Sequence, residues 1–383
     1  MSVSLQVDRR ASCGYERRSR RDEAQVAGIE ALMDLTTSRE VELLTDEPPA
    51  PGELIEVASN LYWARLPLPI RLNHVNLWFM REDEGKGQGE GWLVVDAGLD
   101  APSCRDAWEK LINGPLGGRP VRRLVLTHGH PDHVGLAGWL AERFDSTLHA
   151  TRTEWLFAHW RRERQGRAFG RPMQRFLMSH GLSAEMVKRF AAQDAAIERG
   201  EFPVPEQHIR LRHGEGHEFG GHEFRVIVGS GHADEHASFF RPQGHVLIAG
   251  DQILQRITPV IGVFGHEPQS DPLSDYLGSL PRFEALPQDT LVLPSHGLPF
   301  HGLHARIEQL RAHHEARLAE LLCHMREPQS GFALASLIFE RAMQEGQGRF
   351  ALAETLAHLH YGETIGIVRR LVREDGDVRF VRV

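Results

Sequence analysis

The sequence predicts a mixed α/β fold (α+β) in which β-sheets are covered by helices. Short apolar strand patterns dominate from Leu54 onward, strand and helix patterns then alternate, and the chain beyond His301 is helical. Three apolar strands also end in His or Asp at a glycine-containing turn. Strand ends that face one edge of a sheet would bring such side chains to one place.

The totals are those of an ordinary globular protein larger than one average domain, with 383 residues, 41% of them hydrophobic and 25% charged. A net charge of -8 opposes strong non-specific binding to nucleic acid, although a local basic patch stays open. The three cysteines lie far apart without a Cys-x-x-Cys motif, and the first residues contain no continuous apolar segment of the kind found in a signal peptide or a membrane span. We therefore expect a cytoplasmic protein without disulfides and without a membrane partner.

The chain divides into three predicted parts. Residues 1–50 are an N-terminal extension, partly disordered, with a short helix near 22–33 and a proline-rich end. Residues 51–302 are the main domain, and residues 303–383 are a C-terminal domain. The strand patterns of the main domain are 55–57, 61–64, 75–80, 92–96, 124–126, 147–150, 209–211, 224–228, 237–240, 246–251 and 290–293. Its helix patterns outside the insertion are 102–112, 134–144 and 273–285, the last with a break at Pro281.

A helical insertion is predicted at about 151–199, with two or three helices and little strand signal. Apolar residues gather around Trp155 and around Phe176, and Ser183 suits the N-cap of a third helix. The insertion is either an extra layer of core or a lid over the site described next.

The segment 127–133 has the composition of a metal site. It follows an apolar strand and holds three imidazoles and one carboxylate. A sharp turn at its glycine and proline can aim His128 and His130 at one point, while Asp132 and His133 turn towards a second. These are the side chains that bind zinc and similar ions, so the segment can contribute to binding two adjacent ions. The alternative is a histidine-rich turn that only caps a helix, which the clustering with a carboxylate disfavours.

The residues resemble the metallo-β-lactamase superfamily from about Leu54 to Leu303. The motifs that carry the resemblance, in the family's order, are Asp96-Ala97-Gly98, the 127–133 segment, Gly231-His232 with His236, Gly250-Asp251 and Ser295-His296-Gly297. The resemblance implies an αββα sandwich of two sheets flanked by helices. It also identifies the main domain as the catalytic one.

The resemblance implies a site residue by residue. The expected ligands of the first ion are His128, His130 and His232, those of the second are Asp132, His133 and His296, and the bridging carboxylate is Asp251. Asp96 resembles the carboxylate that orients metal-binding histidines, and His236 is expected to support the site without binding metal. The candidates for lining the pocket are His74, Asn76 and Tyr276, with core packing as the alternative, and His313 and His314 are expected on a solvated helix face.

The complete set resembles glyoxalase II and related thioesterases, lactonases and phosphodiesterases. His130 is unlike the glutamate of the flavo-di-iron branch, and Asp251 is unlike the cysteine of the best-known β-lactam hydrolases. Persulfide dioxygenases, which use one iron, share much of the motif and stay an outside option. No counterpart of the basic glutathione-binding residues of glyoxalase II is evident, so that specific activity is disfavoured.

The C-terminal domain is predicted to contain helices at 305–325, 332–343, 351–360 and 364–370, followed by a hairpin with an Asp-Gly turn. This order indicates a winged-helix-like module. A metallo-β-lactamase domain followed by such a module resembles a subgroup that includes a β-lactamase-like endoribonuclease and fungal polyketide thioesterases. Arginines and acidic residues alternate near the end, so packing on the catalytic domain or a homodimer is favoured over nucleic-acid contact.

The implied function is a binuclear metal-dependent hydrolase. Two divalent ions, with zinc expected and iron or manganese as alternatives, would share a bridging hydroxide that attacks an acyl carbonyl. Asp132 would both bind metal and orient the nucleophile. The expected substrate is a small acyl compound, namely a thioester or a related activated ester or lactone. The alternative is an endoribonuclease or phosphodiesterase using the same two ions, and a non-catalytic binding module is the third option.

Overall fold

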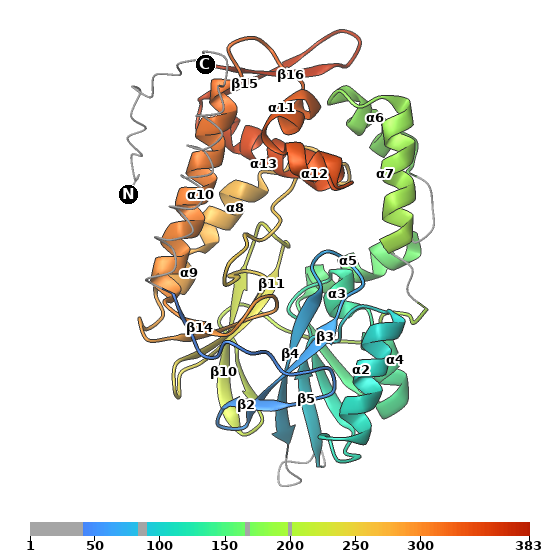
Figure 1. The fold of residues 1–383 in the computed structure, drawn as a ribbon, viewed down its shortest axis with the longest axis vertical. Coiled ribbons are helices and arrows are strands. Elements are labelled where there is room, and N and C mark those ends of the chain that lie inside the picture. Colours follow the sequence, from blue (N-terminus) through green and yellow to red (C-terminus); the bar gives the residue numbers. More distant parts are fainter. Residues whose placement is uncertain (1–40, 83–89, 165–168, 198–200) are drawn as a thin grey trace.

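The structure is a computed structural model that describes residues 41–82, 90–164, 169–197 and 201–383 (Figure 1). The predicted helix at 22–33 and most of the predicted N-terminal extension lie outside the described residues. Within the described ranges, no helix is long and apolar enough to cross a membrane.

Two seven-stranded sheets form the centre of the molecule. The first sheet has the order β2 (Ile55–Ala58), β3 (Leu61–Pro67), β4 (His74–Glu82), β5 (Gly91–Val95), β6 (Val121–Val125), β7 (Thr147–Ala150) and β8 (Ile209–Arg210). The second has the order β1 (Glu42–Leu43), β14 (Phe300–His301), β13 (Leu291–Pro294), β12 (Val246–Gly250), β11 (His236–Arg241), β10 (His222–Gly229) and β9 (Gly216–Phe219).

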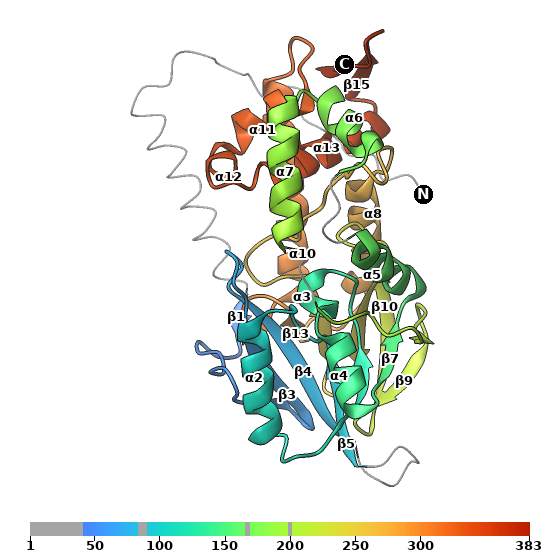
Figure 2. The same cartoon turned by 90° about the vertical axis from the view of Figure 1, so that its right-hand side faces the viewer.

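Alternating side chains pack each sheet on both faces. On β5, Leu93 and Val95 enter the core between the two sheets, whereas Trp92 and Val94 enter the core beneath the flanking helices. The first sheet is covered by α2 (Pro102–Asn113), α3 (Pro131–Val134) and α4 (Ala137–Phe144), and the second by α8 (Pro272–Ser279), α9 (Pro281–Glu284) and α10 (Leu303–Cys323). The αββα layering expected from the sequence is therefore present (Figure 2).

The insertion contains the three helices α5 (Arg152–Arg164), α6 (Arg171–Ser179) and α7 (Ala184–Ile197). Leu177 of α6 and Phe190 of α7 belong to the same buried cluster as the C-terminal helices, beside which α6 and α7 lie in both views (Figures 1 and 2). The backbone N–H of Phe332 donates to the carbonyl of His180, 3.0 Å away, and ties the two parts together. Of the two alternatives for the insertion, an extra layer of core therefore describes α6 and α7 better than a lid does.

The C-terminal region contains α11 (Gly331–Ile338), α12 (Glu340–Gln344), α13 (Gly348–Thr364) and a hairpin of β15 (Val368–Val372) and β16 (Val378–Arg382). The hairpin prediction is confirmed, but the predicted helix at 364–370 is wrong. The chain turns at Gly366, whose φ of +77° ends the helix, and Val368 then pairs with Arg382. The winged-helix assignment and the division of the chain at residues 302 and 303 stay predictions.

His314 corrects another expectation. It is buried on α10, with Nδ1 3.2 Å from Nε2 of His358 on α13, and so does not belong to a solvated face. The reason is tertiary: α13 covers this face of α10, and its packing cannot be inferred from the sequence of α10.

Candidate metal centre

The predicted site residues stand at the ends of five strands that meet at one edge of the sandwich. Asp96 follows β5, the 127–133 segment follows β6, His232 follows β10, Asp251 follows β12 and His296 follows β13. Because β5 and β6 are parallel, and so are β12 and β13, the carboxyl ends of each pair point the same way. The structure brings all seven predicted metal ligands together. Their role as ligands stays a prediction.

The first group consists of three imidazoles that converge on one point. The distances are 2.9 Å from His128 Nε2 to His130 Nδ1, 3.1 Å from that atom to His232 Nε2, and 3.3 Å from His232 Nε2 back to His128 Nε2. Nitrogens bound to one tetrahedral zinc at about 2.0–2.1 Å lie roughly 3.3 Å apart. The spacing is therefore close to that of three ligands of one ion.

The second group mixes imidazole and carboxylate. His296 Nε2 lies 3.5 Å from an oxygen of Asp132, and His133 Nε2 lies 3.7 Å from the same oxygen. Asp251 stands between the two groups, with one oxygen 3.4 Å from His232 Nε2 and the other 3.3 Å from His296 Nε2. This is where a carboxylate shared by two ions would stand.

Outer hydrogen bonds orient three of the imidazoles. Nδ1 of His296 lies 2.8 Å from the carbonyl of His74, and Nδ1 of His232 lies 2.9 Å from the carbonyl of Val260. A carbonyl only accepts, so each Nδ1 carries the proton and each Nε2 presents a lone pair to the site. His133 is held in the same way by the Asp96 carboxylate, 2.8 Å from its Nδ1.

Asp96 is fixed in an uncommon backbone conformation at the end of β5. Its φ is +64°, in the left-handed region that few residues other than glycine adopt. Its carboxylate accepts hydrogen bonds from the backbone N–H of Thr127 at 2.8 Å, from the hydroxyl of the same residue, and from His133. The residue thus ties the end of β5 to the histidine motif after β6.

His236 supports the site from behind. It is fully buried, and its Nε2 accepts the backbone N–H of Asp251 at 3.0 Å. Its ring lies so close to Gly250 that a Cβ there would be 2.5 Å from the imidazole, and Gly250 also has a φ of +58°. Burial, followed by the charge of His232, lowers the pKa of His236 to about 3, which keeps the imidazole neutral.

Two known protein-family models match this chain. A family model described as "Metallo-beta-lactamase superfamily" matches residues 71–296, the part of the chain that contains all seven converging side chains. The chain belongs to the metallo-β-lactamase superfamily. A second model, "Metallo-beta-lactamase-like, C-terminal domain", matches residues 318–383.

Similar proteins span most of this superfamily member. A β-lactamase domain protein from Burkholderia ambifaria is 37% identical, with a TM-score of 0.82, over 91% of this chain and 100% of that one. A metallo-β-lactamase family protein from Thermus thermophilus is 32% identical, with a TM-score of 0.71, over 86% and 100%. A probable metallo-hydrolase, YqjP of Bacillus subtilis (strain 168), is 24% identical over 77% of this chain and 89% of that protein. The chain is a metallo-hydrolase of this superfamily.

Buried, unpartnered atoms of this metallo-hydrolase fit a bound cation. His133 Nε2, His296 Nε2 and Asp251 Oδ1 are buried without a hydrogen-bond partner in the described part of the chain. Such atoms are costly unless something binds them. They belong to the second and bridging positions of the predicted site, and the His and Asp donor set is one that zinc and similar ions accept.

The charge balance differs between the two groups. Burial and the neighbouring histidines lower the pKa of His128 and His130 well below the ordinary value, so both imidazoles are neutral. Burial would also lower the pKa of His133, but the charges of Asp132 and Asp251 override it and raise the pKa well above that value. The first group therefore offers neutral nitrogen donors, whereas the second holds positive charge favourably.

The three pocket candidates have structural contacts. Asn76 is buried and donates from its amide to the carbonyls of Pro294 and Gly297, so it holds the His296 loop. His74 supports the same loop, since its Nε2 accepts the backbone N–H of Gly297. Tyr276 does not line a pocket: it is fully buried in the core, and its hydroxyl donates to the carbonyl of Gln252.

Sequence reasoning missed two supports of the site. Glu154 of α5 is buried and accepts the backbone N–H groups of Gly129 and Glu235, each at 2.9 Å, which fixes the turn between His128 and His130. The second support is the Val260 carbonyl described above. A lone glutamate in a helix and a backbone carbonyl carry no local sequence signal, so only the tertiary structure could show them.

Proposed function

We propose that the chain hydrolyses a thioester, or a related activated ester or lactone, at two divalent metal ions, with zinc as the expected ion. The observation that carries this proposal is the position of Asp251, whose two oxygens reach His232 of the first group and His296 of the second. Two adjacent ions with a shared carboxylate suit hydrolytic chemistry.

The protein's own residues have separable parts in this reaction. Two bound ions would supply an activated water nucleophile near neutral pH and a Lewis acid for the carbonyl oxygen. Asp132 is the most accessible carboxylate of the site, with a side chain that is 18% exposed, so it is placed to bind and orient a water proton. The hydrogen bonds from Asp96 and from the His74 carbonyl keep His133 and His296 in the tautomer that binds metal.

An aromatic wall beside the first group supports an acyl substrate. It consists of Phe157 and Trp160 of α5 together with His266, with ring centroids 5.2–5.8 Å apart. Phe157 lies 6.3 Å from the ring of His130, and Trp160 is 39% exposed. Exposed aromatic surface this close to the metal ligands can pack on the hydrocarbon part of an acyl group.

The same wall favours a second candidate. The guanidinium of Arg161 lies over the ring of Phe157 at 5.5 Å, and that of Arg164 lies over Trp160 at 5.0 Å. Aromatic rings combined with arginines also bind the bases and phosphates of single-stranded nucleic acid. Cleavage of an RNA phosphodiester by the same two ions is therefore the second candidate.

A metal-controlled substrate panel tests the proposal. Full-length protein loaded with zinc, manganese or iron should turn over acyl thioesters, aryl esters or lactones, lose this activity on chelation and regain it with metal. No turnover of any of these by protein with both sites filled would refute the proposal. Cleavage of single-stranded RNA without ester hydrolysis would establish the second candidate.

A variant pair tests the aromatic wall. W160A should raise KM for long-chain acyl substrates with little change for acetyl substrates, because it removes apolar contact far from the carbonyl. L337A removes an exposed leucine, 56% accessible, from α11 and serves as the matched control. Equal effects of W160A on short and long acyl groups would argue against an acyl-binding wall.

A further inference from the structure

A pocket lies at the opposite end of the strands that carry the metal centre. β12 begins at the pocket with Val246 and leads to Asp251, and β13 begins there with Leu291 and leads to His296. The five steps along the chain from Val246 to Asp251 span about 16 Å at roughly 3.3 Å per residue. The pocket is therefore a separate site.

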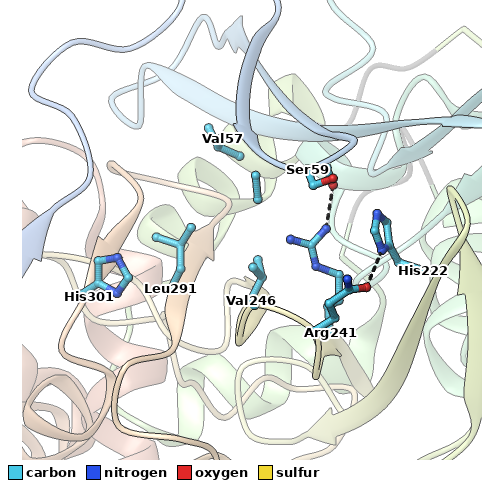
Figure 3. A pocket seen from close by; sticks show the side chains of 10 residues that line it. Val57, Ser59, His222, Arg241, Val246, Leu291 and His301 are labelled. Atoms are coloured by element: carbon cyan, nitrogen blue, oxygen red, sulfur yellow. Dashed lines mark hydrogen bonds between the residues drawn. The ribbon is translucent and has the colours of Figure 1, made fainter.

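Both sheets contribute to this pocket. The end of β2 and the first residue of the turn that follows, residues 57–59, close it from the first sheet, while His222 and Arg241 line it from the second (Figure 3). Its volume is about 360 Å³. This is within the range of about 300–1,000 Å³ that is typical of small-molecule sites.

Arg241, the last residue of β11, places a buried guanidinium in this pocket. The residue is only 4% exposed, and its Nη1 donates to the carbonyl of Ser59 at 2.8 Å, as Figure 3 shows. Its Nε is buried with no hydrogen-bond partner in the ranges that the structure describes. Burial lowers the pKa of this guanidinium, and no carboxylate in these same ranges forms an ion pair with it.

Such a guanidinium calls for an anion. Arginine keeps its charge and offers five N–H donors in a rigid plane that matches a carboxylate. A buried charge is costly unless a counter-ion or hydrogen bonds compensate it. The Ser59 carbonyl engages one nitrogen of the guanidinium, and the unpartnered Nε of Arg241 is left for another acceptor.

Apolar side chains form part of the walls around the cation. Val246 and Leu291 are almost fully buried side chains of the second sheet, and Val57 lies across from them (Figure 3). We propose that this pocket binds a small organic monocarboxylate, with the carboxylate on Arg241 and the hydrocarbon part on Val246 and Leu291. Arg241 is the only arginine or lysine among the described residues that line the pocket. One guanidinium balances one negative charge, whereas a phosphate dianion calls for a second fixed cation. The proposal does not depend on the hydrolytic reaction.

The Nε–H of Arg241 itself can report binding. Full-length protein labelled with ¹⁵N-arginine is titrated with hexanoate and with hexanamide, which has the same hydrocarbon but no charge. The signal of Arg241 is assigned by its loss in R241Q. Chelated and metal-loaded samples are compared, so that carboxylate bound to metal is separated from carboxylate in the pocket.

We expect hexanoate to shift the Arg241 signal saturably in both samples and to bind about tenfold or more tightly than hexanamide, since a charge-assisted hydrogen bond is lost with the amide. V57F narrows the apolar side without touching the guanidinium, and should weaken hexanoate several-fold while acetate still shifts the signal. No saturable shift with hexanoate, or an equal shift with hexanamide, would overturn the proposal. A response to inorganic phosphate as strong as that to hexanoate would overturn the assignment to a monocarboxylate.

Discussion

In the described part of the chain, the buried histidines of the second metal group and a buried histidine pair between α10 and α13 have opposite electrostatic surroundings. At the metal centre, the Nε2 atoms of His133 and His296 lie 3.3–3.7 Å from oxygens of Asp132 and Asp251. Between α10 and α13, His314 and His358 are equally buried, with Nδ1 of His314 3.2 Å from Nε2 of His358. The other ring nitrogen of His358 contacts a backbone carbonyl.

The pKa directions follow from this difference. At the metal centre, burial would lower the pKa of His296, but the charges of Asp251 and Asp132 raise it. Between the helices, burial, followed by the charge of the neighbouring histidine, lowers the pKa of His314 to about 2, and burial lowers that of His358 to about 4. The neighbouring carboxylates therefore decide which of these buried imidazoles carry a positive charge.

The largest effect is expected from Asp251, because its two oxygens reach one histidine of each metal group. D251N keeps the size of the side chain but removes its charge. We expect the loss of at least one ion and a fall in turnover of more than about a hundredfold. The loss of a ligand should exceed the roughly 10–100-fold effect of losing a residue that only orients a ligand. Metal analysis and turnover measure this. D289N, at an exposed carboxylate paired with His245, is the matched control and should change neither.

Next in size is the effect of Asp96, which acts through His133. D96N should weaken the ion of the second group by about 10–100-fold, because it loses the carboxylate that receives the Nδ1 proton. Competition with a chelator measures each ion in turn. Equal weakening of both ions would contradict the separation of the two groups.

A smaller effect is expected from Glu154, which fixes the turn between His128 and His130. E154Q replaces one of two accepting oxygens by an amide that cannot accept from a backbone N–H. We expect a loss of about 1–3 kcal/mol in the free energy of unfolding and a weakening of the first ion of less than about tenfold. Urea denaturation and chelator competition measure both, and unchanged stability would argue against this support.

No effect on metal is expected from the histidine pair between the helices. The folded pKa values of His314 and His358 lie below the ordinary value of 6.5, so the unfolded chain binds more protons below that pH. These two residues thus make the free energy of unfolding fall as the pH drops from 6.5 towards 4.

H314L tests this directly. It should keep the wild-type metal content. It should reduce the slope of the free energy of unfolding against pH, below pH 6.5, by at most about 1.4 kcal/mol per pH unit. Urea denaturation between pH 7 and pH 4 measures the slope, since the comparison with wild type cancels the titration of other groups. Loss of metal in H314L would break the contrast between the two groups.

The convergence of the seven predicted ligands could be expected from the sequence because the motifs that carry them follow strands. His128, Asp251 and His296 come within three residues of the strands that carry them, so the spacing of the motifs already determines the convergence once the sheets form. The αββα layers were implied by the family resemblance, and the strand and helix patterns were compatible with them. Parts that depend on distant pairing were missed, such as the two-residue strand β1, which pairs with β14.

Burial was the harder property to predict. Tyr276 and His314 have polar atoms and look accessible in sequence, but neighbouring helices cover both. The predicted helix after Thr364 failed for a related reason, since the pairing of Val368 with a strand more than ten residues later overrides a weak helical pattern. Such outcomes depend on which elements pack together, which a local pattern does not contain.

Anomalous diffraction at the zinc edge, from crystals of zinc-loaded protein, tests the central claim most directly. We predict two peaks, one flanked by His128, His130 and His232 and the other by Asp132, His133 and His296, with Asp251 between them and no peak beside His314. A single peak, no peak at this site, or a peak at the pair between α10 and α13 would contradict the account.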